Sequence, residues 1–244
     1  MTCSISYDVF FRKDTSLGTL YLIGHGIGNE AETSPYALEI LKKIPVLACE
    51  DTRKIKKLLA DFQIPQIPMS KKFISYFEHN EKIRISQIME ILKSGSDVGV
   101  MVSRGMPLIS DPGYVLVRAC YDENIPVKLA SGPSAFLHAL LISGLPTDKF
   151  LFLGFPPKKP GKQKNFFEKY KNLDVTLLFY ESPRRVLKTL ENLKEIFCEW
   201  YVSVCRELSK EHEEVIRGSY ETVLKKLQDQ EVLGEVVVAL SKKI

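Results

Sequence analysis

The sequence predicts an α/β fold in which short buried strands alternate with helices. Its apolar content of 45% and charged content of 26% are those of an ordinary globular protein. Short apolar runs, such as residues 46–49 and 98–102, recur between longer segments whose apolar residues have helical spacing. Strands separated by helices usually pair in parallel, because the helix returns the chain to the same edge of the sheet. We therefore expect a largely parallel sheet.

The first half of the chain is expected to hold five strands and four helices. The strands are expected at residues 18–23, 46–49, 73–76, 98–102 and 127–130. The helices are expected at residues 35–43, 52–59, 81–93 and 115–122. Ser34 followed by Pro35 is typical of a helix start, because serine caps free backbone N–H groups and proline fits the first turn. A second such start is expected at Ser110 or Asp111, followed by Pro112.

The second half repeats the alternation, and the chain of 244 residues is long enough for two small domains. We place the joint so that the domains are residues 1–130 and 131–244. Strands are expected at residues 150–154, 175–180, 200–205 and 235–240. A helix is expected at residues 135–141, a second after a basic turn at residues 158–164, and a third capped by Ser182 and Pro183. The charged residues 206–214 are expected to form a loop.

Composition excludes several classes of protein. The net charge of +4 and the pI of about 8.6 are only mildly basic, so charge alone does not predict a nucleic-acid partner. The five cysteines form no CxxC pair or Cys/His cluster, which argues against disulfide or zinc frameworks and favours a cytoplasmic location. No apolar run approaches the ~18 residues of a membrane span, and no secretory leader is evident.

Polar or glycine-rich segments follow most of the expected strands. In open α/β sheets, ligands bind at the carboxyl ends of the strands. The central segment of this kind is the loop at residues 103–107, which we expect to form a small-molecule site. The other segments are the glycine-rich residues 24–29, residues 50–53, the turn that holds His79, residues 131–134, and Arg206 with Glu207.

Each segment also has a simpler interpretation. The run GHGIGN lacks the GxGxxG spacing of a dinucleotide site, so it can be a plain tight turn. Residues 50–53 can be a helix cap with a local ion pair, and His79 can be an ordinary surface residue. The lysines at residues 158–164 can be a solvated loop or a contact for a phosphate backbone. No GxSxG, HExxH or Walker motif points to another chemistry.

Taken together, the segments between Gly18 and Leu240 resemble one family. They are LYLIGHGIGN, ACEDTRKIKKLL, SYFEHNE, LISDPGYVLVRAC, GPSAFLHALLISGLPTDKFLFLGFPPKK, LLFYESPRRVLKTL, CRELSKEHEEVIRG and GEVVVAL. In this order they are similar to the ribosomal small-subunit RNA methyltransferase I family, a branch of the tetrapyrrole methylase superfamily. The resemblance implies two α/β domains of the tetrapyrrole methylase type with a cofactor cleft between them.

The resemblance also implies an activity. Members of the family form homodimers, bind S-adenosyl-L-methionine, and methylate the ribose 2′-hydroxyl of a cytidine in 16S rRNA, as free RNA or in the 30S subunit. No metal or membrane is implied. By motif match, the residues implied for cofactor binding are Gly24, Gly26, Ser103, Gly105, Met106, Pro107, Ser134, Tyr180, Leu208 and Glu235.

Methyl transfer to a weakly acidic hydroxyl benefits from a nearby base. The candidate catalytic residues, which would accept the proton or orient phosphates, are Glu50, Asp51, Arg53, Glu207 and His79.

Two loops depart from the family pattern. Gly24-His25-Gly26 stands where the family has alanine, threonine and proline. The loop at residues 103–107 is one residue shorter than the family's, with Arg104 in place of an aspartate and Met106 in place of a threonine. An arginine near a cationic sulfonium is unfavourable unless it points away or is paired. Two alternatives therefore stay open: a catalytically impaired paralogue that acts as an RNA- or ligand-binding accessory dimer, or a tetrapyrrole methyltransferase.

Overall fold

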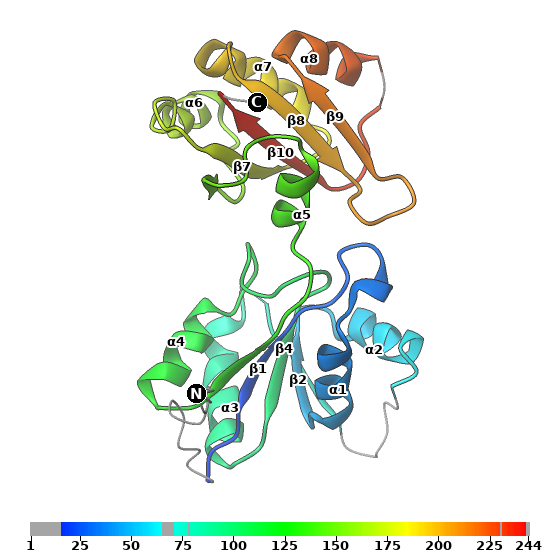
Figure 1. Cartoon of the computed structure of the whole chain (residues 1–244). Helices are drawn as coiled ribbons and strands as arrows, with labels where there is room; N and C mark the ends of the chain where they lie inside the picture. The colour runs from blue at the N-terminus through cyan, green and yellow to red at the C-terminus, as the bar shows by residue number, and fades with distance from the viewer. Residues whose placement is uncertain (1–15, 65–70, 78, 230, 243–244) are drawn as a thin grey trace, which may run out of the picture. The chain divides into compact units, whose positions relative to one another are not determined.

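The computed structural model describes residues 16–64, 71–77, 79–229 and 231–242 (Figure 1). The chain divides into two compact units. Unit 1 comprises residues up to 26 together with residues 31–132, and unit 2 comprises residues 27–30 and those from 133 onward. The joint expected after residue 130 lies two residues before the division after residue 132. Among the described residues, no helix has the length and apolar character needed to cross a membrane.

Unit 1 is a parallel five-stranded sheet in the order β3-β2-β4-β1-β5. Its strands are β1 (Leu20–Ile23), β2 (Val46–Cys49), β3 (Lys72–Ser75), β4 (Val98–Met101) and β5 (Val127–Ala130). Its helices are α1 (Pro35–Lys43), α2 (Thr52–Asp61), α3 (Glu81–Lys93) and α4 (Tyr114–Asp122). The apolar residues of α1 and α2 pack on one face of the sheet and those of α3 and α4 on the other. Strands covered on both faces read as continuous apolar runs, which is why they were predictable.

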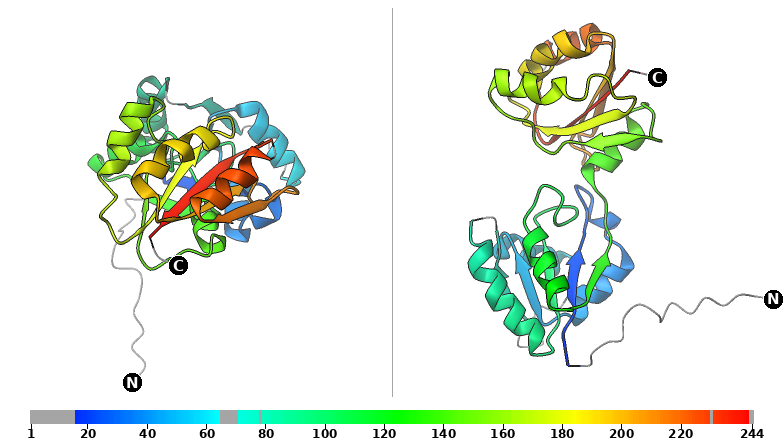
Figure 2. Two further views of the ribbon diagram at one scale, coloured as in Figure 1. Left: turned by 90° about the horizontal axis from the view of Figure 1, so that it is seen from above. Right: turned by 90° about the vertical axis from the view of Figure 1, so that its left-hand side faces the viewer.

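Unit 2 is a mixed five-stranded sheet in the order β6-β7-β10-β8-β9. Its strands are β6 (Phe150–Phe152), β7 (Thr176–Glu181), β8 (Tyr201–Arg206), β9 (Glu214–Gly218) and β10 (Val236–Ser241). Its helices are α5 (Ala135–Ile142), α6 (Pro160–Glu168), α7 (Val186–Phe197) and α8 (Tyr220–Gln228). Helices α6, α7 and α8 cover one face of the sheet, and α5 packs against the other (Figure 2).

The largely parallel pairing expected from the alternation of strands and helices does not hold for most of the sheet of unit 2. Only β6 and β7 are parallel, and β10 runs antiparallel to both β7 and β8. Strand β9 and helix α8 were not predicted. Glu214 and Arg217 break the apolar pattern of β9, because β9 is an edge strand and charged side chains are common on such strands.

Helix starts were predicted unevenly. Ser34 caps α1 by accepting a hydrogen bond from the backbone N–H of Ala37, as expected. The expected start at Ser110 or Asp111 is wrong, because α4 begins at Tyr114 with Gly113 as its N-cap. The cap expected at Ser182 and Pro183 is also wrong, because α7 begins at Val186. The basic turn expected at residues 158–164 belongs largely to α6, which begins at residue 160.

Candidate functional site

In unit 1, the loops after β1 and β4 are joined at the carboxyl edge of the sheet. The backbone N–H of His25 donates to the carbonyl oxygen of Gly105 (3.1 Å), and that of Gly105 donates to Gly26 (3.4 Å). His25 is completely buried, and its Nε2 lies 3.1 Å from the carbonyl oxygen of Val102, which accepts a hydrogen bond from the ring. The loop at residues 103–107 is therefore held against the glycine-rich loop.

Met106 extends this contact to the loop after β5. Its sulfur accepts a hydrogen bond from the backbone N–H of Gly132 (3.1 Å). A Cβ at Gly24 would lie 2.4 Å from that sulfur and 2.8 Å from the nitrogen of Gly132. Such distances are far shorter than van der Waals contact, so this packing requires glycine at residue 24. We call this arrangement the Gly24–Met106–Gly132 contact.

A pocket of about 430 Å³ opens beside these loops, at the end of β2. Its lining is polar and consists of Glu50, Asp51, Thr52, Arg53, Lys54, Ser75 and Ser103. The Oγ of Ser103 donates a hydrogen bond to Glu50 Oε2 (3.0 Å), so residues after β2 and β4 meet here. Four of the residues singled out in the sequence thus line one pocket: Glu50, Asp51, Arg53 and Ser103.

Asp51 and Arg53 have a local structural role in this pocket. The Asp51 carboxylate caps α2 by accepting hydrogen bonds from the backbone N–H groups of Arg53 (2.9 Å) and Lys54 (3.4 Å). It also accepts one from the Arg53 guanidinium, and these bonds hold the pKa of Asp51 below its ordinary value. A carboxylate whose charged form is stabilised in this way is a weak base.

Asp111 is a residue that sequence reasoning missed as a candidate for chemistry. Burial, together with the negative charge of Glu50, raises the pKa of its half-buried carboxyl to about 6. The loop that holds it contains two non-glycine residues with left-handed backbone angles, Leu108 (φ 70°) and Ser110 (φ 62°). Backbone strain and a raised pKa both accumulate at functional sites. The run SDPG at residues 110–113 does indicate a turn at this position, but the same run is also typical of a helix cap.

His79 does not join this group. Its side chain is exposed, its ring meets that of Phe77 edge to face at 6.5 Å, and the residues lining the pocket do not include it.

In unit 2, the candidate residues after β8 and before β10 form an ion-pair network. Glu207 Oε1 accepts hydrogen bonds from Lys210 Nζ (2.7 Å) and from the backbone N–H of Glu235 (2.9 Å), and Lys210 also reaches Glu235 Oε2 (3.0 Å). A Cβ at Gly234, where φ is 86°, would lie 2.1 Å from Glu207 Oε1. Leu208 is buried beside this turn. The Glu207 carboxylate therefore links the segment after β8 to the segment before β10.

The remaining candidates lie elsewhere in their units. Ser134 is buried and is the N-cap residue of α5, without a side-chain capping bond, and Tyr180 lies on β7 among aromatic rings. Pro107 is buried beside Met106 in unit 1.

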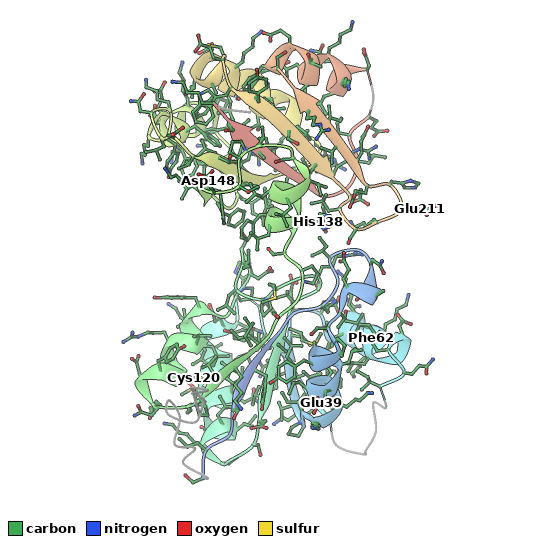
Figure 3. All side chains as sticks on the ribbon, in the orientation of Figure 1. Glu39, Phe62, Cys120, His138, Asp148 and Glu211 are labelled. Atoms are coloured by element: carbon green, nitrogen blue, oxygen red, sulfur yellow. The ribbon has the colours of Figure 1, made fainter. Side chains whose placement is uncertain are left out.

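Helix α5 lies close to the loop between β8 and β9. In Figure 3, His138 marks α5 and Glu211 marks this loop, and His138 Nε2 lies 3.5 Å from Glu213 Oε2 of the loop.

Comparisons with known proteins bear on the identity of the chain. A family model described as tetrapyrrole (corrin/porphyrin) methylases matches residues 19–224. The ribosomal RNA small subunit methyltransferase I of a Hydrogenobaculum species is 40% identical over 225 residues, which are 91% of this chain and 95% of that protein. The chain belongs to the ribosomal RNA small subunit methyltransferase I family. The Thermotoga maritima protein of the same name is 37% identical, and the match covers 93% of this chain and 100% of that protein.

The solved structures that resemble this member of the methyltransferase I family share its fold. A uroporphyrin-III C-methyl transferase from Thermus thermophilus, complexed with S-adenyl homocysteine, superimposes with a TM-score of 0.63. Its sequence is 18% identical, and the match covers 92% of this chain and 98% of that one. The tetrapyrrole methylase fold expected from the resemblance is therefore confirmed.

The two loops that depart from the pattern implied by the resemblance are in direct contact. Gly24 is smaller than the alanine implied by the family pattern, and Met106 is larger than the implied threonine. The sulfur of Met106 occupies the space that a Cβ at residue 24 would need. We interpret the two departures as compensating: the smaller side chain at residue 24 makes room for the larger one at residue 106, so that the space between the loops stays filled.

Proposed function

We propose that this chain transfers a methyl group from S-adenosylmethionine to the ribose 2′-hydroxyl of a cytidine in small-subunit ribosomal RNA. The observation that carries the proposal is 40% identity to a ribosomal RNA small subunit methyltransferase I over 91% of this chain and 95% of that relative. A match that covers most of both proteins supports a shared activity better than a match to one domain would.

The residues at the carboxyl edge of unit 1 fit this cofactor. S-adenosylmethionine supplies a methyl group on a positively charged sulfur, which carboxylates stabilise. Glu50 and Asp111 are neighbouring carboxyls at this edge. Arg104, which reverses the charge of the family's aspartate, is exposed. In unit 1 the cofactor would be held by Gly24, Gly26, Ser103, Gly105, Met106 and Pro107. In unit 2 the residues proposed to hold it are Ser134, Tyr180, Leu208 and Glu235.

Glu50 and Asp111 also suit the task of accepting the proton of the ribose hydroxyl. The pKa of Asp111, about 6, is low enough for the carboxylate to be mostly ionised at neutral pH and higher than that of an ordinary aspartate. Ser103 orients Glu50 through its hydrogen bond. We propose this pair as the base and exposed Arg53 as a contact for an RNA phosphate. Asp51, Glu207 and His79 are alternative bases, and Asp51 and Glu207 already hold structural partners.

The test is a methylation assay with S-adenosylmethionine and small ribosomal subunits that lack the modification. Digestion of the product RNA and mass spectrometry should find a single 2′-O-methylcytidine. Free rRNA is the parallel substrate, so that the assay also shows which form is used. Sedimentation of the protein tests the proposed homodimer. Methylation of a base, or of a uridine or purine ribose, would contradict the proposal.

A second function is favoured by Arg104 and Met106, which replace an aspartate and a threonine of the family pattern. In that case the chain is an accessory protein that binds RNA or another ligand without catalysis. Titration calorimetry with S-adenosylmethionine separates the two. Binding at micromolar concentrations supports the enzyme, and an absence of binding at millimolar concentrations supports the accessory role.

A further inference from the structure

Residues 148–174 of unit 2 concentrate the positive charge of the chain. They contain seven lysines and three acidic residues, an excess of four, and the whole chain has a net charge of +4. The rest of the chain is therefore electrically balanced. An uneven distribution of this kind produces a local positive potential although the protein as a whole is only mildly basic.

Five of these seven lysines form no ion pair with a residue that the structure describes, and three of the five are close together in the sequence. Lys158, Lys159 and Lys162 are exposed, and none forms an ion pair with any residue that the structure describes. Two neighbours differ from them: Lys164 pairs with Glu195 (2.7 Å) and Lys171 with Glu168 (2.7 Å). Lys158, Lys159 and Lys162 are the first lysines after β6 and lie around the start of α6.

Exposed aromatic side chains precede these lysines in the chain. Phe155 is 65% exposed, and Phe150, on the edge strand β6, is 42% exposed. The ring of Phe155 packs against that of Tyr180 at 5.2 Å, and Tyr180 packs against Phe152 at 4.9 Å. We call Phe150 and Phe155, with Lys158, Lys159 and Lys162, the Phe155 surface.

The backbone fixes the position of this surface. The backbone N–H of Leu153 donates a hydrogen bond to the carbonyl oxygen of Leu178 (2.8 Å), and that of Tyr180 donates to the carbonyl oxygen of Gly154 (2.8 Å). The chain is therefore hydrogen-bonded to β7 up to the residue before Phe155. Gly154 then turns the chain with a φ of 61°. Because three residues span at most about 11 Å, the Cα of Lys158 stays within that distance of Phe155. The backbone at Phe155 and that at the first of the lysines are therefore held near each other.

We propose that the Phe155 surface binds a single-stranded segment of the RNA substrate, with a base stacked on Phe155 and the flanking phosphates on Lys158, Lys159 and Lys162. Exposed aromatic rings beside unpaired cations are how proteins bind single strands, because every base has a face that can stack. A second copy of this chain fits the surface poorly, since a two-fold contact would bring like charges together. The assignment rests on the proposed function and adds a substrate surface to it.

The experiment compares variants for binding of a fluorescently labelled oligocytidylate and for methylation of small subunits. Phe155→Ala should weaken binding of the oligocytidylate by about fivefold to 100-fold, and Phe155→Tyr should restore it, because stacking needs only a ring. The double variant Lys158→Gln and Lys159→Gln should lower the slope of log K against log salt by about 1.4, about 0.7 per phosphate contact. In methylation, both changes should raise KM and leave kcat within about twofold.

Matched controls are available on other surfaces. Lys225 and Lys226 are exposed on α8, next to the opposite edge strand, and Tyr121 is 58% exposed on α4. Lys225→Gln with Lys226→Gln, and Tyr121→Ala, should leave oligocytidylate binding unchanged. Calorimetry with S-adenosylmethionine should give wild-type affinity for the lysine and control variants. Because Phe155 packs against Tyr180, urea unfolding is the measurement that shows Phe155→Ala to be folded.

Two results would overturn the assignment. One is wild-type RNA affinity and salt slope in the Phe155 and lysine variants, while the parent protein binds RNA. The other is a change in sedimentation of Phe155→Ala from dimer to monomer, which would make the surface an interface between copies. If the parent protein itself neither binds nor methylates RNA, the proposed function fails instead, so the two failures are distinguishable.

Discussion

The two units use the same residue type, a glutamate at the end of a strand, in opposite ways. In unit 1, the negative charge of Glu50 helps to raise the pKa of Asp111, and neither carboxyl forms an ion pair with a residue that the structure describes. In unit 2, Glu181 pairs with Arg185, Glu207 with Lys210, and Glu214 with Arg206. A carboxylate after a strand is therefore not a catalytic signal by itself. Glu207 is paired with Lys210, three residues later, whereas Arg53, three residues after Glu50, pairs with Asp51 instead. The ion pairs that form, and not the presence of a cation nearby in the sequence, separate a structural carboxylate from one left for chemistry.

The largest expected effect tests the unit 1 side of this comparison. Asp111→Asn removes the carboxyl whose pKa is raised to about 6 and should lower the methylation rate by about 100-fold or more at pH 8, as expected for loss of a general base. In the parent enzyme, kcat/KM should rise with pH through about 6, and this rise should be absent in the variant. Asp61→Asn, at the exposed end of α2, is the control.

The same variant should become more stable. Because the folded pKa of Asp111 lies above its ordinary value, the folded state favours the protonated carboxyl, and that advantage is lost as pH rises through about 6. Above this pH the asparagine variant should be more stable by about 1 kcal/mol, after allowance for the partial exposure of the group. Below pH 4 the difference should vanish. A loss of both activity and stability at pH 8 would indicate a structural role instead.

The next effect tests unit 2. Glu181 is buried, and its carboxylate accepts hydrogen bonds from Thr189 Oγ1 (2.7 Å), Arg185 Nη2 (3.1 Å) and the backbone N–H of Ser182 (2.7 Å). Glu181→Ala leaves these donors without a partner and should reduce the free energy of unfolding by about 3 kcal/mol. Urea unfolding measures it. Glu191→Ala, which breaks the exposed pair with Lys188, should cost only about 0.5 kcal/mol.

A third prediction concerns the Gly24–Met106–Gly132 contact. Gly24→Ala should destabilise unit 1 by about 2 kcal/mol, because the new Cβ meets the Met106 sulfur and the Gly132 backbone. Met106→Thr alone should also destabilise, since it removes the acceptor of the Gly132 N–H. The double variant should be less destabilised than the sum by about 1 kcal/mol, because threonine frees part of the space. Strict additivity would mean that the two departures from the family pattern are independent.

The sequence predicted unit 1 well because its strands are buried on both faces. All five strands and four helices fall near their expected residues, and the loops expected to meet at the carboxyl edge do meet there. The pattern could not show that Met106 would pack on Gly24, since that contact joins residues 82 positions apart whose types have no obvious complementarity. Nor could it separate Asp111 from a helix cap, because both uses favour the same Ser-Asp-Pro-Gly run.

Unit 2 was less predictable for a physical reason. Apolar runs identify β7, β8 and β10, but they do not show which strands are neighbours in the sheet. The last strand, β10, pairs between β7 and β8, and this order sets the relative strand directions. The partners of Glu207 were equally hidden. Lys210 lies close in sequence, but the backbone N–H of Glu235 comes from a segment 28 residues away.

The smallest expected effect is that of a substitution at Glu207, which tests the difference between the two units. Glu207→Gln keeps an oxygen for the Glu235 N–H and removes the charge facing Lys210, which retains Glu235 as a partner. If Glu207 is structural, the variant should lose about 1 kcal/mol of stability and keep its methylation rate within about twofold. The pH dependence of kcat/KM should also be unchanged. A rate loss as large as that expected for Asp111→Asn, with stability intact, would place the base in unit 2 and reverse the assignment of roles between the units.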